Sequence, residues 1–106
     1  MIVRRAFLAA LLVFSGFTAS GKSKPHSVTL TWVTPAPVRG MSVVGYNVYR
    51  RSKTEKKYTK IASGIPGPPF EDHNVVSGKA YFYTVTALDK TGRESSFSQN
   101  IEAKIP

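Results

Sequence analysis

The residues with the clearest chemical potential are six cations that fall within eleven positions, Arg50 to Lys60, where Glu55 is the only acid. These cations are Arg50, Arg51, Lys53, Lys56, Lys57 and Lys60; Tyr49 directly precedes them and Tyr58 lies among them. Cations beside aromatic rings hold sulfated or phosphorylated chains through charge attraction and stacking. The segment is therefore a candidate site for a polyanion or an acidic polysaccharide. Solubility is the alternative explanation, because lysines on a protruding hairpin also prevent edge-to-edge pairing of sheets.

Catalytic and metal-binding arrangements are absent from the sequence. No serine lies in a Gly-x-Ser-x-Gly turn, and the histidines are His26 near the start and His73 at the end of an expected strand. Asp72 and His73 resemble a dyad, but strand neighbours point to opposite faces, and Glu71 cannot converge with them on one ion for the same reason. We expect these polar residues to face solvent. We predict no catalytic, metal-binding or cofactor-binding residues, and hence no enzyme.

The composition narrows the class of partner. The chain has no cysteine, which excludes disulfides, zinc–thiolate sites and thiol catalysis. Its formal net charge is +9 at pH 7, which favours polyanionic partners such as acidic polysaccharides or anionic surfaces. No motif that reads bases is present, so we expect no specific binding to nucleic acid.

The first twenty residues have the three parts of a secretory signal peptide. Arg4 and Arg5 precede the apolar run 6–14, and Thr18-Ala19-Ser20 supplies small residues for cleavage after Ser20. The apolar stretch is shorter than the roughly 20 residues that a membrane-spanning helix needs, so no transmembrane segment is expected after cleavage. We assign residues 1–20 to the signal peptide, 21–26 to a flexible lead-in and 27–106 to one domain. The protein is then exported, to a periplasm, a cell surface or the medium.

The rest of the chain reads as short strands separated by turns. Apolar and polar residues alternate at period two, and Gly- and Pro-rich turns follow at regular intervals. The expected strands are 27–33, 43–52, 58–62, 70–75, 81–88 and 96–105. Strands of this number and spacing indicate an all-β sandwich of six or seven antiparallel strands.

Several motifs together resemble a fibronectin type III domain of the kind found in bacterial exported proteins. They are Val28-Thr29-Leu30-Thr31-Trp32, Gly45-Tyr46-Asn47-Val48-Tyr49-Arg50, Val75 with Gly78 and Tyr81, Val85-Thr86-Ala87 and Gly92-Arg93-Glu94-Ser95. The resemblance implies an immunoglobulin-like sandwich with Trp32 packed between the sheets. It also implies that the Tyr81 hydroxyl bonds the backbone a few residues upstream. Only residues 21–26 precede the Trp-bearing strand after cleavage, so we expect the first strand to be short or missing.

Two functional hypotheses follow. The leading one is a non-catalytic secreted or cell-surface interaction module, with a protein or adaptor role, whose partner is an unknown protein or a cell-surface or wall polymer. The alternative is binding of a polyanion or carbohydrate through the basic 50–60 hairpin.

Overall fold

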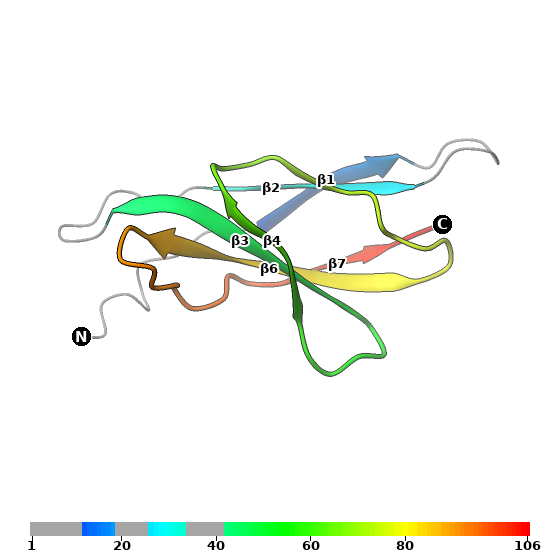
Figure 1. The fold of residues 1–106 in the computed structure, drawn as a ribbon. Helices are drawn as coiled ribbons and strands as arrows, with labels where there is room; N and C mark the ends of the chain where they lie inside the picture. Colours follow the sequence, from blue (N-terminus) through cyan, green and yellow to red (C-terminus); the bar gives the residue numbers. More distant parts are fainter. Residues whose placement is uncertain (1–11, 19–25, 34–41) are drawn as a thin grey trace.

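Two antiparallel sheets pack face to face in the computed structural model, which describes residues 12–18, 26–33 and 42–106 (Figure 1). The strands are β1 (Leu12–Thr18), β2 (Ser27–Trp32), β3 (Val43–Ser52), β4 (Thr59–Ile65), β5 (Phe70–Asp72), β6 (Ala80–Asp89) and β7 (Ile101–Lys104). One sheet has the order β1-β2-β5 and the other the order β4-β3-β6-β7. No helix among the described residues is long and apolar enough to cross a membrane. The prediction of an all-β sandwich is confirmed.

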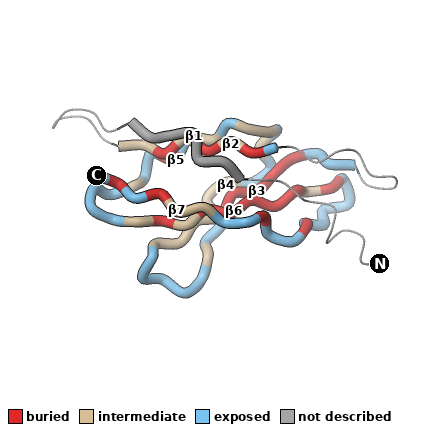
Figure 2. The backbone as a smooth tube through the Cα atoms, turned by 180° about the vertical axis from the view of Figure 1, so that it is seen from behind, coloured by how far each residue is buried: buried red, intermediate tan, exposed pale blue. Residues whose placement is uncertain are grey.

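The core lies between the two sheets and follows from the alternation of each strand. Side chains at every second position of β2, β3 and β6 point inward, and the other positions point outward. The buried set includes Val28, Leu30, Trp32, Tyr46, Val48, Tyr83 and Val85. The Trp32 and Tyr46 rings meet across the sheets with their centroids 5.5 Å apart. Figure 2 shows buried segments on the facing strands and exposed residues on the hairpin that joins β3 to β4.

The first strand differs from the expectation that it is short or missing. β1 is a seven-residue strand that pairs with β2 from Leu12 opposite Trp32 to Thr18 opposite Ser27. It is formed by residues that we assigned to the signal peptide, because an apolar run with Val and Phe suits both a leader and a strand. Cleavage after Ser20 would remove β1, so a single molecule cannot both lose the leader and keep this strand. The assignment of residues 1–20 stays a prediction, and most of the lead-in 21–26 lies outside the described residues.

The turn before β6 has the geometry that the resemblance implies. The backbone N–H of Val76 donates a hydrogen bond of 3.0 Å to the hydroxyl of Tyr81. Gly78 has a φ of 85° in this turn, a left-handed conformation that residues with a Cβ rarely adopt. The predicted corner is therefore confirmed.

A buried ionic contact joins the two sheets, and it corrects the expectation that Asp72 faces solvent. Asp72 on β5 is 4% exposed and accepts hydrogen bonds from Arg50 Nη1 on β3, at 2.8 Å, and from the hydroxyl of Tyr83 on β6, at 2.7 Å. Burial and then the Asp72 carboxylate raise the pKa of Tyr83, so its hydroxyl remains a donor. The neighbouring His73 points outward and pairs with Glu71 at 3.0 Å, so strand alternation separates the supposed dyad as predicted.

Candidate binding face

Four of the predicted site residues lie together on the outward face of the sheet β4-β3-β6-β7. Because Tyr46 and Val48 point into the core, Tyr49 and Arg51 point outward from β3. The Lys60 ammonium, from β4, lies 5.8 Å from the centroid of the Tyr49 ring. The guanidinium carbon of Arg51 lies 5.3 Å from the ring centroid of Tyr58 and 4.5 Å from that of Phe82 on β6. With Phe97, these residues form what we call the aromatic face: Tyr49, Arg51, Tyr58, Lys60, Phe82 and Phe97.

Phe97, like Phe82, is a residue of this face that the sequence did not reveal. Its ring centroid lies 5.0 Å from that of Tyr49 and 5.5 Å from that of Tyr58, and half of its surface is exposed. The register places Tyr49 opposite Lys60, and Phe97 contacts both tyrosine rings.

The position of Phe97 follows from the residues that form hydrogen bonds with the backbone of β6 where β7 does not pair with it. The last strand was expected to begin at Ser96, but β7 begins at Ile101 and pairs only with the first part of β6. Beyond it, the hydroxyls of Ser95 and Ser98 accept hydrogen bonds from the backbone N–H groups of Ala87 (2.9 Å) and Val85 (3.0 Å). The N–H groups of the same serines donate to the carbonyls of Ala87 and Val85. Both serines therefore point at the strand, and Phe97 between them is left on the outer surface.

Glu94 fixes the other side of this segment. Its Oε2 accepts hydrogen bonds from the Tyr49 hydroxyl, from Asn47 Nδ2 at 2.8 Å and from Thr86 Oγ1 at 2.8 Å. Partial burial opposes ionisation, but these three hydrogen bonds prevail and lower the pKa of Glu94. Burial and the Glu94 carboxylate raise the pKa of Tyr49 to about 12. The Tyr49 ring is thus held in place by an ionised acceptor.

A tight turn over residues 89–93 places Glu94 beside Tyr49, Asn47 and Thr86. The carboxylate of Asp89 accepts hydrogen bonds from the backbone N–H groups of Thr91, at 2.9 Å, and Arg93, at 3.1 Å. Gly92 has a φ of 91°, which closes the turn. Glu94 then forms a bridge with Leu88 of β6, so the chain returns along the strand it has just left.

The other predicted cations lie elsewhere. Arg50 points inward and is held by Asp72. Lys53 lies 3.4 Å from the carboxylate of Glu102 on β7. Lys56 and Lys57 are exposed at the tip of the hairpin, which projects from the sandwich (Figure 1). The six cations therefore do not form one site.

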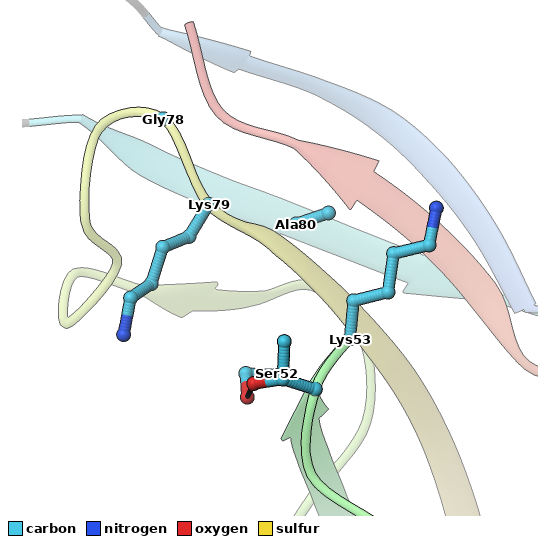
Figure 3. A pocket seen from close by; sticks show the side chains of 6 residues that line it. Ser52, Lys53, Gly78, Lys79 and Ala80 are labelled. Carbon is cyan, nitrogen blue, oxygen red and sulfur yellow. Dashed lines mark hydrogen bonds between the residues drawn. The ribbon is translucent and has the colours of Figure 1, made fainter.

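A cavity of about 270 Å³ lies beside the base of the hairpin, next to the turn that precedes β6. It is lined by Ser52, Lys53, Thr54, Gly78, Lys79 and Ala80. Figure 3 shows the side chains of Lys53 and Lys79 pointing away from each other. Two ammonium groups that diverge cannot hold one anion between them, so this cavity is a poor anion site.

Among the residues that the structure describes, no three His, Asp or Glu side chains lie close enough together to hold a metal ion. The outward face presents aromatic rings, side-chain amides, hydroxyls and a few charged groups. Such groups suit recognition by stacking and hydrogen bonding.

Comparison with known proteins gives matches to both sequence and fold. No family model matches the chain. It is 38% identical over 84 residues to an amylopullulanase of Thermoanaerobacterium thermosulfurigenes, and 48% identical over 54 residues to one of Thermoanaerobacterium saccharolyticum. These matches cover 79% and 51% of this chain, and the chain spans only 4% of the length of each relative. Among solved structures, an Fn3-like protein from Clostridium thermocellum is similar with a TM-score of 0.64 at 28% identity, over 93% of this chain and 96% of that one.

Proposed function

We propose that this chain, which is a fibronectin type III-like domain, is a non-catalytic accessory module that associates with the polysaccharide substrate of an amylopullulanase-like enzyme. The observation that carries the proposal is its similarity to segments of two amylopullulanases. A sandwich that matches 4% of an enzyme's length has the size of an appended module rather than of a catalytic domain. The name of these relatives denotes α-glucans of the amylose and pullulan type, so an α-glucan is the substrate class that we assign.

The site of action follows from the size of the substrate. A polysaccharide too large to cross a membrane must be degraded outside the cytoplasm, and any module that holds it must work there too. The predicted signal peptide at residues 1–20 agrees with this location. We propose that the module acts at the cell surface or in the medium.

Binding of a polyanion through the 50–60 hairpin is the second candidate. Lys56 and Lys57 support it, because both are exposed at the tip and lie next to each other in the sequence. The positions of Arg50 and Lys53 weaken this candidate, because each cation already lies beside a carboxylate of the protein, Asp72 and Glu102 respectively. This candidate differs from the first in its expected dependence on salt.

A depletion assay on insoluble starch tests the proposal. The chain is mixed with starch granules, and the protein left in solution is measured beside a basic protein of similar size and unrelated fold. We expect the chain to be depleted, the control protein to stay in solution, and no reducing sugar to be released. Failure to bind any α-glucan, or release of sugar by the purified chain, would overturn the proposal.

A further inference from the structure

We infer that the aromatic face is the surface that holds the polysaccharide, and that it takes a neutral glucan chain rather than an acidic one. The inference rests on the proposed function, because that function supplies the substrate class. It adds the site and the residue on which a sugar ring stacks. That residue is Phe97.

Phe97 has the exposure that stacking requires. Half of its surface is exposed, although its ring packs on Tyr49 and Tyr58. A pyranose ring presents C–H groups on one face, and burial of these groups against an aromatic ring removes apolar surface of both from water. The Lys60 ammonium beside Tyr49 and the side-chain amide of Asn100 beside Tyr58 supply hydrogen-bonding groups at the border of the rings.

The rings of this face are held before any ligand arrives. The Tyr49 hydroxyl donates to Glu94, and the Tyr58 hydroxyl accepts a hydrogen bond of 3.1 Å from Asn100 Nδ2. Both tethers come from the segment that carries Phe97, so the three rings are fixed relative to one another. A surface that is already ordered loses little side-chain entropy on binding, which favours affinity for a weak ligand such as a sugar chain.

The face carries a small excess of positive charge, because Arg51 and Lys60 are opposed by the Glu94 carboxylate at its border, and this excess is too small to select an acidic chain. The charge of Lys60 helps to lower the pKa of Glu94. The Arg51 guanidinium donates a hydrogen bond of 2.9 Å to the Glu55 carbonyl and lies over two rings. An acidic polysaccharide would meet the Glu94 carboxylate as well as the cations, whereas a neutral chain has no charge to be repelled.

The exposed apolar area is too small for a stable protein partner. Stable protein interfaces bury about 1,200–2,000 Å² in total, with an apolar centre of several side chains. Here Phe97 is the large apolar residue of the face with half its surface exposed, while the tyrosines are half-buried. One ring flanked by polar groups fits a single sugar unit.

The test compares variants of the full chain for binding to starch, pullulan, cellulose and dextran sulfate over a salt series. Phe97→Leu keeps apolar bulk against the tyrosines but removes the flat ring, and Phe97→Ala removes both. Val76→Ala is the matched control, because Val76 is 52% exposed and lies in the turn before β6. The fluorescence of Trp32, the only tryptophan, reports whether each variant is folded.

We expect both Phe97 variants to bind starch and pullulan about tenfold more weakly, with little effect of salt, and Val76→Ala to bind like wild type. Starch binding that survives both Phe97 changes would overturn the inference and leave the proposed function intact. Binding to cellulose but not to α-glucans, lost in Phe97→Leu, would support the aromatic face and overturn the α-glucan assignment. Binding to dextran sulfate alone, abolished by Lys56→Glu with Lys57→Glu, would overturn both, as would binding to none of the four polymers.

Discussion

Replacement of Asp72 by alanine should destabilise the fold far more than loss of any exposed carboxylate. The substitution removes the acceptor that Arg50 and Tyr83 share between the two sheets. The Arg50 guanidinium and the Tyr83 hydroxyl then remain shielded from water without the carboxylate that accepts their hydrogen bonds. These two unpaired groups set the loss in the free energy of unfolding.

The magnitude follows from their burial. Removal of one member of a buried ion pair costs about 3–5 kcal/mol. The lower end applies here, because the Arg50 side chain is 23% exposed and also donates to the carbonyl of Asn74 at 3.1 Å, whereas that of Asp72 is 5% exposed. The fully buried Tyr83 hydroxyl adds a penalty of about 1–3 kcal/mol that overlaps with the first. We expect a total of about 3 kcal/mol, a large share of the roughly 5–15 kcal/mol that stabilises a domain.

Urea denaturation followed by Trp32 fluorescence measures this loss. For an m-value of about 1–3 kcal/mol/M, the midpoint should fall by about 1–3 M urea. Glu71→Ala is the matched control, because it removes a carboxylate from the same strand that pairs with His73 on the surface. That pair has side chains 57% and 66% exposed, so its loss should cost at most about 1 kcal/mol. A cost below about 1 kcal/mol for Asp72→Ala, or a cost no larger than that of Glu71→Ala, would show that the contact of Asp72 with Arg50 and Tyr83 does not stabilise the fold.

Three further predictions concern the corner, the aromatic face and the first strand. Tyr81→Phe should lower the free energy of unfolding by about 1 kcal/mol in urea denaturation, and a neutral result would contradict the corner hydrogen bond. Burial and Glu94 raise the pKa of Tyr49 from 10.0 to about 12. Between these two pH values the native state keeps a proton that the unfolded state loses. The resulting stabilisation is complete below pH 10 and should be lost as the pH rises to 12, which urea denaturation at several pH values would measure. In an absorbance titration Glu94→Gln should lower this pKa but leave it above 10.0, and an unchanged value would exclude the contact. Deletion of residues 1–20 removes β1, so hydrogen exchange at the β2 amides that face it should accelerate, and unchanged protection would mean that β1 does not cover that edge.

The core and the corner were predictable because they depend on local patterns. The resemblance to fibronectin type III domains implied that Trp32 lies between the sheets and that Tyr81 forms the corner, and the motifs that carry this resemblance are short segments of sequence. Strand alternation puts Arg50 on the core side of β3, since it has the parity of Tyr46 and Val48. Strand alternation alone could therefore have excluded Arg50 from the outward site. We included Arg50 because it belongs to a dense run of cations.

The remaining features depend on contacts between distant residues. Phe97 reaches the aromatic face because Ser95 and Ser98 bind the backbone of β6, and nothing in the segment itself shows that register. Asp72 is buried because Arg50 and Tyr83 meet it from the opposite sheet. β1 was missed for a different reason, because an apolar run meets the requirements of a leader and of a strand equally well.

Chemical-shift mapping of the full chain with a malto-oligosaccharide shows whether the aromatic face binds a neutral glucan. Binding at this face should produce shifts in the ¹H–¹⁵N spectrum at Tyr49, Tyr58, Lys60 and the segment that carries Phe97, and these shifts should persist at high salt. Shifts confined to the hairpin tip at Lys56 and Lys57, shifts on the sheet that contains β2, or no shifts at all would contradict binding at this face.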